Sequence, residues 1–216
     1  LAAIFQFAAN EGGIVAILVA GVLAAIWLPM VISGMHVAIC MIAITNFMAT
    51  GVDSFVLPVT TVVLWCEYGS EVAAWVKLRN KEEKSLCLGY TVANMIGGVG
   101  EPFIYGIQFR YRRVFAATIV SGFVAGVLCM ALGVNVYLAG AASNVLNLLA
   151  FVGGGTQNFI NACIASGVGF VVAFFAYILL WLYRGRTRER SSFRTRLIIL
   201  KGQTEETALR GRLLYR

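Results

Sequence analysis

The side chains best suited to chemistry are a few ionisable residues that interrupt long apolar stretches. Glu101 stands in the sequence GGVGEPFIYG (97–106), among glycines and directly before a proline. Glycine permits tight bends and proline ends helices, so this segment is unsuited to an ordinary packed helix. A carboxylate in a membrane segment costs about 3 kcal/mol, which makes it a functional candidate. Its oxygens can accept hydrogen bonds from two vicinal hydroxyls; the structural alternative is capping of backbone N–H groups or pairing with a buried cation.

Two further candidates, His36 and Asp53, follow glycines at positions where helices are expected to break. His36 is the only histidine, and it can exchange hydrogen bonds with a hydroxylated ligand or carry a proton. A lone histidine is also often a structural residue. Asp53 comes shortly after Gly51 and either caps the next helix or lies on a substrate pathway.

Three more polar residues are placed where they could line such a pathway. Glu67 and Glu71 are four residues apart and share one face of an expected helix, which turns toward a cavity or toward the membrane interface. Asn94 precedes the glycine-rich turn and is one of several amides suited to a ligand or to a cap. The five cysteines are scattered in apolar surroundings without a Cys/His cluster, so no metal site and no cofactor are expected.

The elements that position these residues are expected to be membrane-spanning helices. The chain of 216 residues is 60% hydrophobic and 12% charged, far from the composition of soluble domains. About 20 apolar residues span a bilayer as a helix, and clear spans are predicted at 12–32, 114–134 and 159–183. The predicted fold class is therefore an all-α polytopic membrane protein, with transmembrane helices and, as argued next, re-entrant hairpins.

Between these spans the sequence is less regular. Segments 33–50 and 52–76 are apolar but interrupted by polar residues, and 77–84 is predicted as a charged connecting loop. Gly122 and Gly126 have the spacing of a close contact between two membrane helices.

Basic clusters flank segment 85–109 on both sides. Four Lys/Arg residues precede it within 77–84, and three arginines follow it within 110–113. Cytoplasmic loops carry the excess of Lys and Arg, so both flanks are predicted on the cytoplasmic side. The segment then enters the membrane and returns as a re-entrant hairpin, with Glu101 at its tip. Such backbone is tolerated only where it is buried in protein or lines a wet cavity, which indicates a substrate pathway.

The net charge of +7 is concentrated at the end of the chain. Residues 1–183 contain seven Lys/Arg and seven Asp/Glu, whereas residues 184–216 contain ten Lys/Arg and three Glu. Because this basic tail directly follows a span, retention on the cytoplasmic side explains it better than nucleic-acid binding. We expect a membrane domain at 1–183 and a basic cytoplasmic tail or linker at 184–216. The apolar start at Leu1 leads us to expect that N-terminal helices are missing.

Several motifs together resemble a known family. They are GMHVAI (34–39), GVDSFVLP (51–58), KLRNKEEKSL (77–86) and GGVGEPFIYG with QFRYRR (97–113). In order and spacing they resemble the membrane-embedded IIC component of bacterial sugar phosphotransferase systems, in the sucrose, β-glucoside and trehalose branch of the glucose superfamily. The likeness extends from about residue 12 to residue 183.

The resemblance implies a homodimeric permease in the inner (plasma) membrane whose mobile transport domain carries a glucoside or disaccharide across the bilayer. Glu101 and His36 match the residues that bind sugar hydroxyls in the family, and Glu67, Asn94 and Asp53 remain pathway candidates. The resemblance also implies a partner, the soluble IIB component, whose phosphocysteine supplies the phosphoryl group; no cysteine of this chain is expected to do so.

The sequence departs from the family at three points. Val37 replaces a second histidine, Glu67 stands where an uncharged glutamine is usual, and the tail from Arg186 has no likeness to the family. Two alternatives therefore stay open. One is an ion-coupled secondary sugar transporter with Glu101 and His36 as a proton relay, and the other is a truncated permease without activity.

Overall fold

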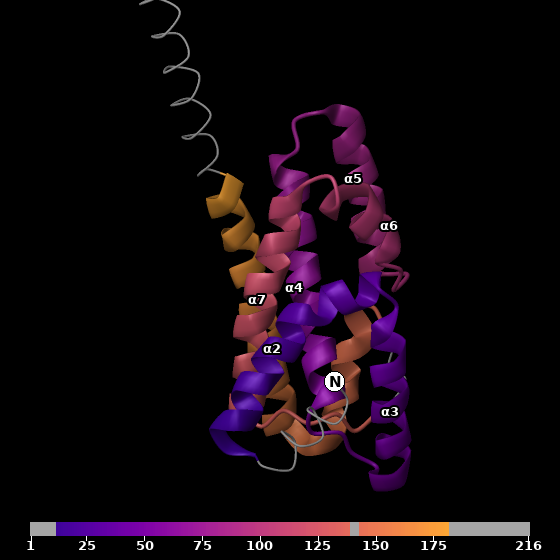
Figure 1. Ribbon diagram of the computed structural model, residues 1–216, viewed down its shortest axis with the longest axis vertical. Helices are drawn as coiled ribbons and strands as arrows, with labels where there is room; N and C mark the ends of the chain where they lie inside the picture. The colour runs from indigo at the N-terminus through magenta and orange to yellow at the C-terminus, as the bar shows by residue number, and fades with distance from the viewer. Residues whose placement is uncertain (1–11, 139–142, 182–216) are drawn as a thin grey trace, which may run out of the picture. The chain divides into compact units, whose positions relative to one another are not determined.

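The computed structural model describes residues 12–138 and 143–181, which are helical with no β-strand (Figure 1). In this described part three helices are long and apolar enough to cross a membrane: α2 (Gly13–Ile32), α7 (Arg112–Ala131) and Val145–Trp181. They are helices where the three spans were predicted, which confirms the assignment to all-α membrane proteins. The third begins earlier than predicted, with a 3-10 stretch, η2 (Val145–Gly154), that leads into an α-helix at 155–181.

Shorter or more polar helices connect these spans. They are α3 (Met35–Thr50), α4 (Val56–Lys77), α5 (Lys81–Met95), α6 (Glu101–Phe103) and the π-helix η1 (Ile104–Gln108). The prediction of a loop over 77–84 is wrong in its second half, because α5 already begins at Lys81. The side chain of Asn80 accepts the backbone N–H groups of Glu82 and Glu83 and so caps the helix in the middle of the charged stretch.

Small residues allow α2 and α7 to approach closely. A Cβ atom added at Gly126 would lie 2.6 Å from the Ala20 carbonyl oxygen, and one at Gly122 would lie 2.8 Å from that of Ala24. No side chain fits at these distances, so both positions require glycine where the backbones meet. The helix contact predicted from the spacing of the two glycines is confirmed, and α2 is its partner (Figure 1).

The helix α4 packs against α2, α3, α5 and α7, and it also contacts the last helix. At Gly69 an added Cβ atom would overlap the backbone of Phe170. Because α4 lies against all these elements, residues on its different faces reach different neighbours. This helix carries Glu67 and Glu71.

The chain divides into two compact units, Leu1–Ile178 and Leu179–Arg216. All features discussed below belong to the first unit. The basic tail predicted at 184–216 lies outside the described residues.

Candidate functional site

Four of the five predicted site residues line one cavity of about 350 Å³. His36 comes from the first turn of α3, Glu67 from α4, Asn94 from the end of α5, and Glu101 from the first position of α6. They are 65 residues apart at the extremes, and the helix packing brings them to one place. The cavity is thus built from helix ends and from one face of α4.

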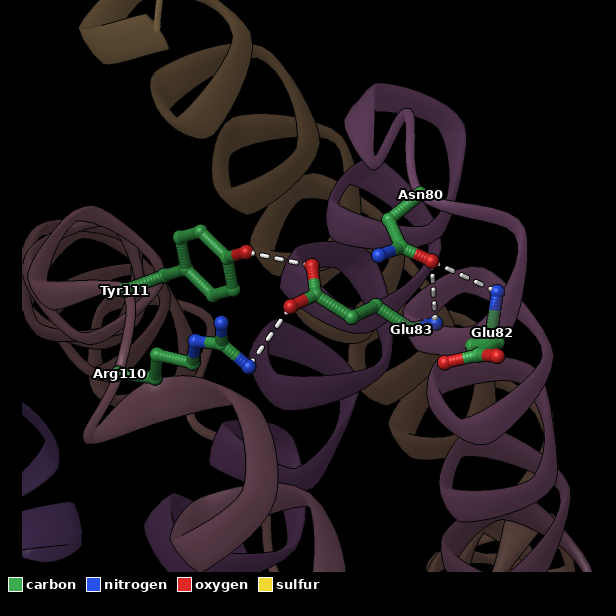
Figure 2. A network of polar contacts seen from close by, with 5 residues as sticks. All are labelled: Asn80, Glu82, Glu83, Arg110 and Tyr111. Carbon is green, nitrogen blue, oxygen red and sulfur yellow. Dashed lines mark hydrogen bonds and ion pairs between the residues drawn. The ribbon is translucent and has the colours of Figure 1, made fainter.

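Glu101 belongs to a helical hairpin whose two arms are α5 and α6–η1. At the base of the hairpin, the carboxylate of Glu83 forms an ion pair with Arg110 (Oε1 to Nη1, 2.7 Å) and accepts a hydrogen bond from the Tyr111 hydroxyl (2.7 Å) (Figure 2). Higher up, an added Cβ atom at Gly106 would lie 2.6 Å from the ring of Tyr90. The arms therefore run side by side from the base upward.

The bond to Glu83 also affects the acidity of Tyr111. It raises the pKa of the phenol above its usual range, because the hydrogen bond to the carboxylate needs the protonated hydroxyl and the carboxylate charge disfavours the phenolate. The base of the hairpin is thus held by two interactions that need an ionised Glu83 and a neutral Tyr111.

The turn at the tip of the hairpin is formed by residues 96–100. Gly98 has φ +73°, and its N–H donates to the Asn94 carbonyl at the end of α5. The amide of Asn144 donates to the Ile96 carbonyl and ties the tip to the segment before η2. Pro102 was expected to end a helix but stands in the first turn of α6, where its missing N–H costs nothing.

Glu101 faces the cavity with its carboxylate unused. Within residues 12–138 and 143–181 this side chain makes no hydrogen bond and no ion pair, and it is exposed. Neither structural role considered for it, a backbone cap or a buried ion pair, is present among these residues. Its two oxygens are available to a ligand.

His36 is held from one side by the end of α2. Its Nδ1 lies 3.4 Å from the Met30 carbonyl oxygen, and its ring meets Trp27 edge to face at 6.0 Å. A carbonyl only accepts, so this contact is a hydrogen bond when Nδ1 carries the proton. In the neutral ring Nε2 is then an acceptor for a ligand donor.

The two glutamates of α4 have different surroundings. Glu67 lines the cavity, whereas Glu71, one turn later, is fully buried and outside it. Asn94 also lines the cavity, and its Nδ2 donates to Glu71 Oε1 at 2.6 Å. The helix face predicted for the two glutamates thus turns Glu67 toward the cavity and Glu71 toward Asn94 of α5.

Asp53 is not among the residues that line the cavity. Its Oδ1 accepts the backbone N–H groups of Phe55 (2.7 Å) and Leu57 (3.3 Å) at the start of α4. Its backbone pairs with Val136 in an isolated β-bridge. These bonds match the capping role that the sequence allowed for Asp53.

Other residues that line the cavity were not singled out as site candidates in the sequence, among them Trp27 and Asn147. Trp27 provides an aromatic wall, and Asn147 lines the cavity while its Oδ1 accepts the indole N–H of Trp65. Asn147 lies in a Gly/Asn-rich stretch, which signals polar function only in general terms. Trp27 lies near the end of an apolar run, and nothing in the sequence pairs it with His36.

Comparison with known proteins gives matches to components of PTS systems. The chain is 32% identical over 168 residues to the PTS system beta-glucoside-specific EIIBCA component of Bacillus subtilis, covering 77% of this chain and 26% of that protein. It is 29% identical over 105 residues to the PTS system arbutin-, cellobiose-, and salicin-specific EIIBC component of Escherichia coli, covering 49% and 22%.

It is also 25% identical over 169 residues to the PTS system MurNAc-GlcNAc-specific EIIBC component of Staphylococcus epidermidis, covering 78% and 34%. The chain thus spans between about a fifth and a third of the length of these curated relatives. No protein-family model matches the chain, and no solved structure matches it significantly.

Proposed function

We propose that this chain, which belongs to the membrane-embedded IIC family of bacterial sugar phosphotransferase systems, binds a glucoside or disaccharide and passes it across the membrane for phosphorylation by a IIB partner. The observation that carries the proposal is the cavity, in which His36, Glu67, Asn94 and Glu101 meet. The relatives named for β-glucosides, for arbutin, cellobiose and salicin, and for MurNAc-GlcNAc support the substrate class.

The lining of the cavity suits a sugar. Its volume of about 350 Å³ is within the range of small-molecule sites, about 300–1,000 Å³. Carboxylates, an imidazole and amides line it together with apolar side chains such as Val31, Ile44 and Leu64. A pyranose has hydroxyls around its edge and C–H groups on its faces. The polar side chains can therefore bind the hydroxyls, and the apolar side chains can pack against the C–H groups.

Glu101 and His36 have complementary roles in this proposal. The free carboxylate of Glu101 accepts hydrogen bonds from two neighbouring hydroxyls, and such bonds to a charged group are worth about 1.5–3 kcal/mol each. His36, held by Met30 and Trp27, offers its outer nitrogen to a third polar group. Together they orient the hydroxyl that will attack phosphorus.

The phosphoryl donor is proposed to be a phosphocysteine of the IIB partner. The sugar hydroxyl forms the new O–P bond while the S–P bond breaks, and the hydroxyl proton goes to an acceptor of the site. In the described residues, Cys66, Cys87 and Cys129 are buried, and Cys40 touches the cavity among apolar groups. A thiolate donor needs an electropositive, accessible setting, which these positions do not offer.

The hairpin is proposed to be re-entrant. The Glu83–Arg110 ion pair holds its two ends together, as a hairpin that leaves and re-enters the same membrane face requires. The basic residues at both ends favour the cytoplasmic face. In this arrangement the protein lies in the inner membrane, its tail is cytoplasmic, and the complete permease is a homodimer.

The test is phosphorylation driven by phosphoenolpyruvate. Membranes that carry the protein as its cell makes it are supplied with the soluble phosphocarriers and with salicin, arbutin, cellobiose, sucrose or MurNAc-GlcNAc. We expect phosphorylation of at least one β-glucoside, dependent on the carriers. Delivery of free sugar that an uncoupler abolishes would instead support the ion-coupled transporter, and no uptake of any kind would support an inactive permease.

A further inference from the structure

Glu71 is the buried acidic residue that the proposed mechanism does not use. Its side chain is 0% exposed, and it lies behind the cavity rather than in its wall. Oε1 accepts the Asn94 amide at 2.6 Å, and Oε2 has no hydrogen-bond partner among the described residues. The one cavity residue to which its carboxyl group is hydrogen-bonded is Asn94.

Such a residue is costly if its only role is structural. A buried carboxyl group with an unpartnered oxygen is destabilising, and replacement of buried ionic groups by apolar ones of similar volume is often neutral or stabilising. Leucine or methionine would fill the same space in α4. We therefore ask what the acidic side chain of Glu71 does to its partner Asn94.

The amide of Asn94 contacts both α4 and the tip of the hairpin. Its nitrogen donates to Glu71 on α4. On the other side, the amide packs against the hairpin tip: an added Cβ atom at Gly100 would lie 3.3 Å from Oδ1 and 3.4 Å from Nδ2. Gly100 directly precedes Glu101, so the amide links α4 to the tip.

An asparagine amide can present either its oxygen or its nitrogen to a ligand. The nitrogen of Asn94 donates to Oε1 of Glu71, so the nitrogen faces α4 and the amide oxygen is left for the other side. We propose that Glu71 is a positioning residue that fixes the Asn94 amide so that position 94 offers the sugar an acceptor. This inference rests on the proposed function and adds the residue that determines whether position 94 accepts or donates a hydrogen bond to the sugar.

The first experiment removes or keeps the acceptor at position 71. Glu71→Met has a similar length and no acceptor, whereas Glu71→Gln keeps an oxygen that can accept the Asn94 amide. With radiolabelled salicin we expect Glu71→Met to raise KM about tenfold with little change in kcat, the loss of about 1.4 kcal/mol of sugar binding. Glu71→Gln should stay within about twofold to threefold of the wild type.

A double-mutant cycle separates positioning from a general effect on the fold. If Glu71 acts through Asn94, Glu71→Met adds nothing to the rise in KM that Asn94→Ala causes alone. If the two effects multiply, Glu71 acts on its own and the proposal is wrong. An unchanged KM in Glu71→Met would also overturn it.

A polarity exchange covers the case in which Glu71→Met fails to accumulate in the membrane. Asn94→Asp replaces the amide donor that faces Glu71 by a second carboxyl group and should raise KM at least tenfold. Glu71→Gln combined with Asn94→Asp restores one donor and one acceptor in reversed order, while an oxygen of residue 94 still faces the cavity. We expect this pair to recover most of the affinity for salicin; failure to recover it would contradict the proposal.

The result for the wild type distinguishes this inference from the function on which it rests. If wild-type membranes phosphorylate none of the five sugars, the proposed function is wrong and the inference falls with it. If the wild type phosphorylates salicin and the Glu71 variants bind it equally well, only the positioning role is wrong.

Discussion

Substitution of Gly126 by alanine should loosen the contact between α2 and α7. The new Cβ atom would lie 2.6 Å from both the carbonyl oxygen of Ala20 and the Cβ of Ala24. Ordinary carbon contacts are about 3.5–4.0 Å long, so the helices must separate locally by about 1 Å. Neither neighbour is the flexible end of a side chain, which leaves the backbones to move.

The expected cost follows from these distances. Overpacking costs about 1–3 kcal/mol, and a shift of two backbones belongs at the upper end. Alanine recovers up to about 1 kcal/mol of helix propensity. The net loss of about 2 kcal/mol corresponds to a fall in Tm of about 4–8 °C for a chain of this size.

Gly167 provides the matched control. It also lies within a helix, but an added Cβ atom there meets nothing within 4 Å. Gly167→Ala should therefore keep or raise Tm, opposite in sign to Gly126→Ala. Thermal unfolding in detergent can be followed with a thiol-reactive dye, because Cys66, Cys87 and Cys129 are free and buried in the folded protein.

Equal Tm values for Gly126→Ala and the wild type would refute the packing of α2 on α7. The site offers a second readout, because α2 carries Trp27 into the cavity wall. A displacement of α2 should also weaken sugar binding in Gly126→Ala and leave it unchanged in Gly167→Ala.

Three further predictions concern the ends of the hairpin and the start of α4. The pKa of Tyr111, followed by ultraviolet difference spectra, should lie above the usual tyrosine range, and Glu83→Gln should lower it. Because the pKa is raised in the folded state, the bond to Glu83 stabilises the protein fully below the ordinary tyrosine pKa of about 10. This stabilisation is lost as the pH rises through the raised pKa. A Tyr111 titration that Glu83→Gln leaves unchanged would contradict the hydrogen bond between Tyr111 and Glu83. Arg112→Cys, at the exposed end of the hairpin, should react with an impermeant thiol reagent from the cytoplasmic side alone, and labelling from outside would exclude a re-entrant hairpin. Asp53→Ala should lower the free energy of unfolding by about 1 kcal/mol while the KM for sugar stays constant, and Asp53→Asn should cost less; a raised KM would return Asp53 to the substrate pathway.

The membrane spans and one helix contact could be predicted because they depend on local properties. Apolar runs of bilayer length indicate helices whatever surrounds them, and the four-residue spacing of Gly122 and Gly126 already indicates a close approach. The identity of the partner helix could not be predicted, because Ala20 and Ala24 are unremarkable in sequence. The start of α5 was missed because charge suggested a loop, whereas the Asn80 cap begins a helix there.

Four residues singled out in the sequence line the cavity, but their arrangement could not be predicted. Glu101 and His36 were recognisable as polar residues at helix breaks, and the cavity brings both together. Glu67 lines the cavity whereas Glu71 is hydrogen-bonded to Asn94, which lies 23 residues further along the chain. Pairings over such separations are set by packing, which leaves no periodic signal in the sequence.

The most direct test of the central claim is binding of salicin to the protein in which Glu101 is replaced by glutamine. Loss of the charge removes two charge-assisted hydrogen bonds of about 1.5–3 kcal/mol each, so affinity should fall at least a hundredfold with unchanged insertion into the membrane. Glu82→Gln is the matched control: Glu82 stands at the start of α5 (Figure 2), is exposed, and is not among the residues that line the cavity. Wild-type affinity in Glu101→Gln, or an equal loss in Glu82→Gln, would contradict the assignment of the cavity as the sugar site.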